Sequence, residues 1–383
     1  MRAWRRAMLS GALLVLTPGV FAQAPATQQG GTSQPPIFRA GVNVVRVDAV
    51  VTNRAGAPVT DLKQDDFEIT EGGKRQTISN FSLVMLDGGL MPGPEGPPVG
   101  ISSDEVEQEE ARREDVRLFT IFLDDYHVSP ESSRIVREQV SRFVETQLGP
   151  SDMVGVMYPL TPLASIRMTR DHASVIRVLQ QFEGRKGDYR PRNAIEEGYV
   201  YKLGMGRSVE QIRNEVVFSA LKALAMRMGA MKDGRQSVIL VSEGYVGARG
   251  SLYLDLGDVA QMASRYNTAI YPVNPLILTP NQRSMPGDAL ESLNYLAQHS
   301  GGRALLDQAE TGAEYRERFA TPELPRSRLT TAMKQLVIDA SVYYLIGYSP
   351  QSPPDDKFHR IDVKVKRRNV EVRHREGYWA RKP

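Results

Sequence analysis

The sequence predicts an α/β protein with a mostly parallel, doubly wound sheet in three layers, accompanied by an accessory antiparallel β module. The first indication is a region, residues 117–310, in which short apolar runs alternate with segments of helical periodicity. Continuous apolar runs are typical of parallel strands that are buried on both faces. The second indication is the alternation of apolar and polar residues near both ends of the chain, which predicts strands with one exposed face.

These patterns place the individual elements of the α/β region. The predicted strands are "RLFTIFLDD", "DMVGVMYPL", "ASIRMT", "QSVILV", "TAIYPVNP" and "RALL". The predicted helices are "SPESSRIVREQVSRFVETQLG", "DHASVIRVLQQF", "NEVVFSALKALAMRMGAM", "GDVAQMASRYN" and "ALESLNYLAQHSGG". We expect the first helix to begin with Ser129 as its N-cap and Pro130 in its first turn, and to end at Gly149.

The accessory β module is predicted to consist of two halves, residues 37–85 and 341–383, with the α/β region inserted between them. Joining the halves is favoured because a small module alone buries too little surface. Residues 86–116 begin Gly/Pro-rich and continue as the charge run "SSDEVEQEEARRED", which predicts a solvated linker or an exposed helix. Residues 311–340 are predicted to form a connecting helix.

Composition narrows the class of protein. The chain has 383 residues, enough for two or three domains, and its 41% apolar and 24% charged residues are ordinary for a globular protein. The net charge is only +3, and no stretch combines basic and aromatic residues as nucleic-acid motifs do, so no nucleic-acid partner is expected. The chain contains no cysteine, which excludes disulfides and lipid attachment at a cysteine.

The first residues, "MRAWRRAMLSGALLVLTPGVFAQAPA", place three arginines before an apolar run and small residues after it. This is the layout of a secretory signal peptide, predicted to cover residues 1–22, and the apolar run is too short to span a membrane comfortably. Residues 23–36 are predicted to form a disordered tether. We therefore expect an exported protein, periplasmic or extracellular, without an integral membrane segment after cleavage.

Polar side chains follow two of the predicted strands at the point where each strand ends. They are Asp124, Asp125, His127 and Ser129 after the first strand, and Ser242 and Glu243 after "QSVILV". In α/β sheets, ligands bind at the carboxyl ends of the strands near a switch in strand order. If the two strands are neighbours, these side chains meet at one edge, and their oxygens favour Mg²⁺, Ca²⁺ or Mn²⁺.

Three stretches of the sequence together resemble the VWFA-related proteins of acidobacterial type, a divergent branch of the von Willebrand factor type A domains. They are "VVRVDAVVTNRAGAPVTDLKQDDFEITEGG", "FLDDYHVSPES" and "YYLIGYSPQSPPDDKFHRIDVKVKR". The resemblance implies a Rossmann-like domain with a metal-ion-dependent adhesion site at the top of its sheet. Asp125 then stands for the aspartate of the family's Asp-x-Ser-x-Ser motif. His127 occupies the first serine position and Ser129 the second, and Ser242-Glu243-Gly244 occupies the "Thr-Asp-Gly" turn.

This sequence departs from the family's pattern at several of these positions. His127 replaces a hydroxyl and is a poorer Mg²⁺ ligand, and Glu243 is one methylene longer than the expected aspartate. No convincing threonine occurs in "GDYRPRNAIEEGYVY". In the other register Asp124 is the first aspartate, but Val128 then falls in a serine position and cannot coordinate. Both an occupied divalent-cation site and a degenerate, metal-free edge stay open.

Each candidate residue also has a purely structural interpretation. In this interpretation Ser129 is a helix cap and nothing more, and Asp124 accepts hydrogen bonds from backbone amides. His127 is a hydrogen-bonded or surface residue, and Glu243 is a turn residue. Catalysis is not predicted, because the chain has no nucleophile elbow, no phosphate loop with lysine and no His-Glu-x-x-His motif.

The sequence therefore predicts an exported, non-enzymatic binding protein that presents the top of its sheet to another protein. In the family's usual mode, an acidic residue of the partner completes the coordination of the metal. The competing hypothesis is a metal-independent envelope scaffold or assembly protein that acts through the β module. Residues 183–208, which mix Arg, Lys, Tyr and Gly, are a second candidate surface or a solvated variable loop.

Overall fold

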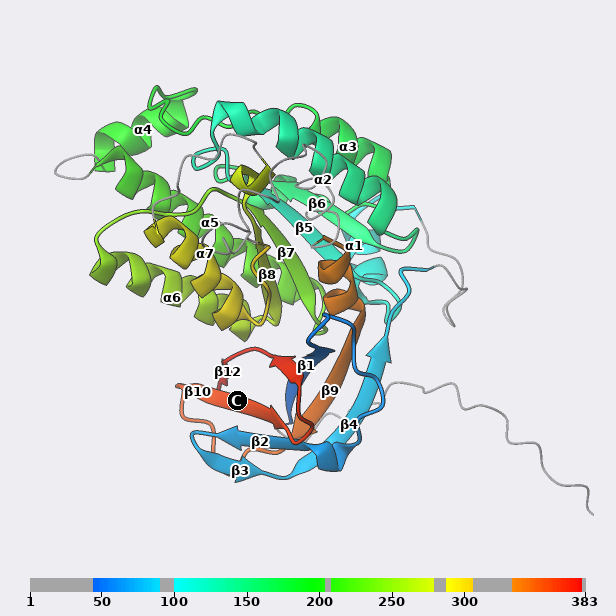
Figure 1. Ribbon diagram of the computed structural model, residues 1–383. Helices are drawn as coiled ribbons and strands as arrows, with labels where there is room; N and C mark the ends of the chain where they lie inside the picture. The colour runs from blue at the N-terminus through cyan, green and yellow to red at the C-terminus, as the bar shows by residue number, and fades with distance from the viewer. Residues whose placement is uncertain (1–43, 90–99, 204–207, 279–286, 306–332, 381–383) are drawn as a thin grey trace, which may run out of the picture. The chain divides into compact units, whose positions relative to one another are not determined.

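The computed structural model contains a parallel sheet of four strands and two antiparallel sheets (Figure 1). The residues that the structure describes are 44–89, 100–203, 208–278, 287–305 and 333–380. The predicted signal peptide, the tether and most of the predicted connecting helix lie outside these ranges, and residues 333–341 are helical. No helix within the described ranges combines the length and apolarity that a membrane span requires.

The parallel sheet has the strand order β6-β5-β7-β8, and all of its pairings are parallel (Figure 1). Its strands are β5 (Leu118–Leu123), β6 (Met153–Met157), β7 (Gln236–Val241) and β8 (Thr268–Val273). Every residue of β5, β7 and β8 is buried, as continuous apolar runs predict. From β5 the chain passes to β6 on one side and then to β7 on the other, so strand order switches at β5.

Helices pack on both faces of this sheet. They are α2 (Ser133–Gln147), α3 (His172–Leu179), α5 (Val209–Met231), α6 (Arg249–Arg265) and α7 (Gly287–Ser300), whereas α4 (Ala194–Leu203) packs against α5. One apolar core joins Phe119 and Ile121 of β5 to Phe143 of α2. The other joins Phe122 of β5 to Phe218 of α5. Successive side chains of a strand point to opposite faces, so both faces of the sheet are covered, in agreement with a three-layer arrangement.

Two of the predicted strands do not form within the described ranges, which include only residues 303–305 of the second. The segment "ASIRMT" makes a single antiparallel bridge, between Thr169 and Val154, and begins within the 3₁₀ turn Leu163–Ser165. Its apolar residues Ile166 and Met168 pack into the core instead of extending the sheet. The segment "RALL" likewise contributes one parallel bridge to β8. Both segments contain residues that favour strands, but tertiary packing overrides this preference and no ladder of strand hydrogen bonds forms in the described residues.

The charge run predicted to be a solvated linker or exposed helix forms the helix α1 (Asp104–Arg112), and one side of α1 is buried. Glu107 is 2% exposed and its carboxylate accepts a hydrogen bond from the backbone N–H of Met168 at 2.9 Å. Glu110 is also buried and pairs with Arg170 at 2.8 Å. The predicted exposure of this segment is wrong, because the acids of α1 contact cations and amide donors that come from distant parts of the chain.

The β module is built from both ends of the chain, as predicted. One sheet has the order β11-β1-β9-β4 and the other β12-β10-β2-β3. The N-terminal strands are β1 (Val45–Asn53), β2 (Phe67–Glu71), β3 (Lys74–Gln76) and β4 (Ile78–Met85). The C-terminal strands are β9 (Val342–Tyr348), β10 (Phe358–Val365), β11 (Val370–Arg373) and β12 (Gly377–Trp379). Strand β1 pairs with β9 and β11, and β2 pairs with β10, so neither half forms its sheets alone.

Replacing Glu107 with alanine tests whether α1 is docked. The substitution leaves the buried N–H of Met168 without its acceptor, so we expect the free energy of unfolding to fall by about 1–3 kcal/mol. The exposed neighbour Glu109 is the matched control, and Glu109→Ala should change stability by no more than about 0.5 kcal/mol. Denaturant unfolding followed by circular dichroism measures both, and equal effects would contradict the docked helix.

The β10 residue His359 makes the stability of the β module depend on pH. Its Nδ1 lies 2.5 Å from Glu71 Oε1 on β2, and its Nε2 lies 2.9 Å from Asp355 Oδ1. The hydrogen bond to Glu71, followed by that to Asp355, raises the pKa of His359 above its usual 6.5. A raised folded-state pKa gives stability that is complete below about pH 6.5 and is lost as pH rises through the folded-state value.

We therefore expect wild-type protein to lose more stability than His359→Gln between about pH 6 and pH 8. Thermal unfolding across this range in constant ionic strength is the measurement. Parallel curves for the two proteins would show that His359 carries no such linkage.

Candidate functional site

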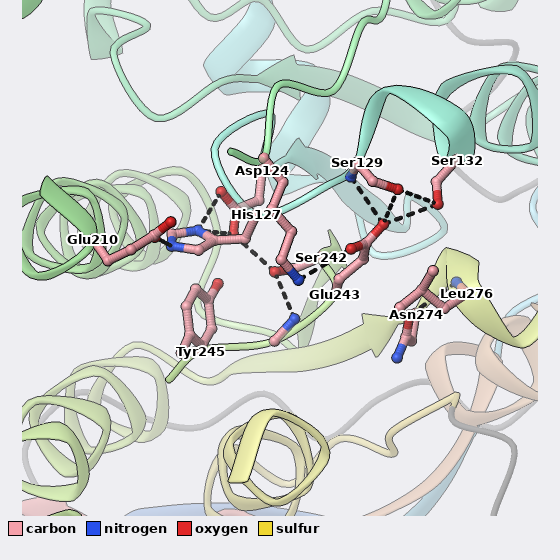
Figure 2. A network of polar contacts seen from close by, with 12 residues as sticks. Asp124, His127, Ser129, Ser132, Glu210, Ser242, Glu243, Tyr245, Asn274 and Leu276 are labelled. Carbon is pink, nitrogen blue, oxygen red and sulfur yellow. Dashed lines mark hydrogen bonds and ion pairs between the residues drawn. The ribbon is translucent and has the colours of Figure 1, made fainter. Parts of the chain in front are cut away.

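All six polar residues predicted from the sequence lie on the loops that follow β5 and β7, which are adjacent strands. Figure 2 shows five of them: Asp124, His127, Ser129, Ser242 and Glu243. We call this edge the rim, comprising residues 124–133 and 242–245. Backbone bonds join the two loops: the N–H of Asp124 donates to Val241 O at 3.1 Å, and the N–H of Glu243 donates to His127 O at 3.1 Å. The predicted meeting of the two strand ends is confirmed.

The first cluster at the rim surrounds Asp124, which is fully buried. His127 Nδ1 lies 2.9 Å from both carboxylate oxygens, and the Ser242 hydroxyl donates to Oδ2 at 2.8 Å. The N–H of Gly244 donates in turn to the Ser242 oxygen at 3.2 Å. Side chains, rather than the backbone amides expected from the sequence, therefore satisfy Asp124 (Figure 2).

His127 is 3% exposed and lies between two carboxylates. Its Nε2 lies 3.6 Å from Glu210 Oε2, and the ring of Tyr245 packs edge-on at 4.9 Å. Burial, followed by the charge of Asp124, raises the pKa of Tyr245 well above 10.0. Because Ser242 contacts Asp124 rather than His127 Nε2, the three residues do not have the arrangement of a nucleophilic serine triad.

The second cluster surrounds the carboxylate of Glu243, which is 2% exposed. Its Oε1 accepts hydrogen bonds from Ser129 N at 2.8 Å, Ser129 Oγ at 2.7 Å and Ser132 Oγ at 2.9 Å. Its Oε2 lies 3.1 Å from Lys186 Nζ. Ser129 is the N-cap of the 3₁₀ turn Pro130–Ser132, but its side chain does not cap, and the N-cap of α2 is Ser132 rather than the predicted Ser129. Glu243 instead supplies a negative charge at this helix start.

Asp125 belongs to a third set of contacts. Arg185 Nε lies 2.9 Å from Asp125 Oδ2, and the same guanidinium lies over the ring of Tyr126 at 4.6 Å and donates to Glu196 Oε2 at 3.0 Å. Burial raises the pKa of Asp125, and Arg185 opposes this effect. Sequence reasoning expected Asp125, Ser129 and Glu243 to converge. The structure joins Ser129 to Glu243, and no described hydrogen bond or ion pair joins Asp125 to either.

The basic residues at the rim come from a loop that sequence reasoning treated as a separate surface. The N–H of Arg185 donates to Asp125 O at 2.8 Å, and that of Lys186 donates to Val128 O at 3.0 Å. Gly184 is required for this approach, because a Cβ there would lie 2.4 Å from Val128 O. The run "GRK", a glycine followed by two cations after a predicted helix, was the available sequence signal.

The arrangement does not fit a divalent cation. Asp124 is bonded by His127 and Ser242, Asp125 by Arg185, and Glu243 by hydroxyls and Lys186. Within the described ranges, no group of three or more His, Cys, Asp or Glu residues is placed to hold a metal ion. A hard divalent cation takes about six or more oxygen ligands, and the ammonium group of Lys186, 3.1 Å from Glu243, would repel it. The divalent-cation site predicted from the sequence stays a prediction for a binding measurement to decide.

Replacing Asp124 with alanine should be among the more destabilising changes at the rim. The substitution leaves buried His127 and Ser242 without their shared acceptor, so we expect unfolding to become easier by about 3 kcal/mol. The half-exposed Asp362, which pairs with Lys364 at 3.5 Å, is the control, and Asp362→Ala should cost less than about 1 kcal/mol. Guanidinium unfolding measures both, and a cost below 1 kcal/mol for Asp124→Ala would contradict the network.

Comparisons with known proteins give little guidance. No protein-family model and no curated protein matches the chain. The solved structures that match include the N-terminal domain of TFIIH p34, with 12% identity, coverage of 57% of this chain and 95% of that chain, and a TM-score of 0.29. A similarity at this level carries no argument about fold or function.

Proposed function

We propose that this protein is an exported, non-enzymatic protein-binding module similar to a von Willebrand factor type A domain, and that it binds through the rim and the adjoining insert. Support for the place comes from the strand order, since the rim lies where the order of the sheet switches, the usual ligand position in α/β folds. Support for the class comes from the family resemblance of the sequence phrases quoted above.

The observation that carries the proposal is a cluster of exposed apolar side chains beside the rim. Among the large hydrophobic residues exposed in the described ranges, Tyr189, Ile195 and Tyr199 are 45%, 62% and 41% exposed and lie within one short segment. Arg190, in the same segment, is 89% exposed. We call these four residues the insert patch. Exposed tyrosine and arginine are typical of the centres of protein interfaces.

The insert patch is held to the rim by stacked cations and hydrogen bonds. Arg213 of α5 lies over the rings of Tyr126 and Tyr189 at 4.8 and 4.9 Å. The Tyr126 hydroxyl donates to Glu196 Oε1 at 2.7 Å. A surface that is already ordered loses less entropy when a partner binds, which favours recognition of another folded protein.

The pairing of the rim carboxylates favours a binding mode that does not require a divalent cation. In the family's usual mode, a partner's acid completes the coordination of the metal. Here Arg185 and Lys186 already neutralise two of the rim acids. The partner would then contact the insert patch by apolar burial, the dominant favourable contribution to most protein association.

The test is capture of envelope proteins from the protein's own cells by the purified mature chain, with chemical cross-linking. We expect a partner that wild type retains, that a Tyr189→Ser/Tyr199→Ser double variant loses at least tenfold, and that EDTA does not release. Leu254 of α6, 74% exposed, is the matched control, and Leu254→Ser should retain the partner. Loss with EDTA would favour the adhesion mode, and loss only with Met85→Ser on β4 would favour the scaffold hypothesis.

A further inference from the structure

A buried carboxylate needs a compensating charge, and at the rim that charge comes from the protein itself. Glu243 is 2% exposed, and three hydrogen bonds converge on its Oε1. These donors are neutral, so they leave the negative charge in place. An isolated buried carboxylate costs several kcal/mol unless a cation accompanies it. The cation is Lys186, whose Nζ lies 3.1 Å from Oε2.

We propose that Lys186 takes the place of a divalent metal ion at this rim, as a built-in cation that also excludes such an ion. The side chain of Lys186 is 37% exposed, so it reaches from solvent to the buried acid. An ammonium group is a compact point charge with donors for carboxylate oxygens, which makes lysine a suitable substitute for a small cation. Its positive charge at contact distance repels a second cation from the same oxygens.

The loop before α4 fixes Lys186 in this position. The backbone N–H of Gly184 donates to Ser133 Oγ at 2.9 Å, and that of Lys186 donates to Val128 O at 3.0 Å. Arg137 of α2 donates to Phe182 O at 2.7 Å. These bonds, before the lysine and at its own N–H, fix the backbone from which the side chain reaches Glu243.

Removing the ammonium group would leave a set of oxygens that a hard cation can use. Glu243 would keep its carboxylate, and the hydroxyls of Ser129 and Ser132, which lie 2.9 Å apart, would adjoin it. Carboxylate and hydroxyl oxygens, completed by water, suit Mg²⁺ or Mn²⁺. The substitution of one lysine is therefore expected to convert a rim that is insensitive to metal into one that binds it. This inference deepens the proposed function, since it names the charge at the rim, but it needs no partner to test.

The experiment compares the melting temperature of the mature full chain in EDTA and in excess Mg²⁺ or Mn²⁺. Wild type should melt at the same temperature in all three. Lys186→Met, which keeps the apolar stem, should melt about 2–4 °C lower in EDTA and recover at least half of that loss with metal. Lys364, 72% exposed, is the matched control, and Lys364→Met should show neither effect.

The Glu243→Gln variant tests whether the cost of Lys186→Met comes from the lost ion pair with Glu243 or from the substitution itself. Without the negative charge, adding Lys186→Met should lower the melting temperature by less than 1 °C and should create no response to metal. Lys186→Arg keeps a positive charge and should behave as wild type toward metal. The proposal would be overturned if the melting temperature of wild type rises with Mg²⁺. It would also be overturned if Lys186→Met lowers the melting temperature equally in wild type and in the Glu243→Gln variant, whatever the partner experiments show.

Discussion

The parallel pairing of β5 with β7 is the constraint on which the candidate site depends. It brings residue 124 beside residue 242, although more than a hundred residues separate them, and the Ser242 hydroxyl then reaches Asp124 at 2.8 Å. The same pairing places Glu243 against Ser129 at the start of α2. Because all residues of both strands are buried, a shift of either strand would move apolar side chains out of the two cores. The register of the rim is therefore held by the core beneath it.

Asp124 and Glu243 are buried at this edge and Asp125 is 15% exposed, and the charge of each acid is compensated differently. Asp124 receives bonds from an imidazole and a hydroxyl, Asp125 faces a guanidinium, and Glu243 faces hydroxyls and an ammonium group. Removing any one partner would leave a buried charge or donor unsatisfied. The loop that carries Arg185 and Lys186 thus has two roles, since it stabilises the rim and leads directly into the insert patch. Stability of the site and presentation of the proposed binding surface are therefore coupled through one segment.

Local sequence patterns were sufficient for much of the fold and for the position of the site. Apolar runs identified β5 to β8, alternation identified the two halves of the β module, and polar residues after strands identified the rim. The same patterns misjudged "ASIRMT" and the acidic run of α1. In both cases the decisive contacts come from elsewhere: Ile166 packs against the core, and Glu107 accepts a bond from Met168. Periodicity reports which side of an element is apolar, but it does not report which distant group satisfies a charge.

By itself the sequence determined the fold class, the shared β module and which acids lie at the strand ends, because these depend on hydrophobic pattern and on chain order. Only the tertiary structure decided that Asp124 rather than Asp125 contacts Ser242, and that Arg185 and Lys186 approach the rim acids. A one-residue difference at a strand end reverses the direction of a side chain, and the path of a long loop depends on packing. Charge pairing across such a loop is a property of the folded chain, since no local spacing encodes it.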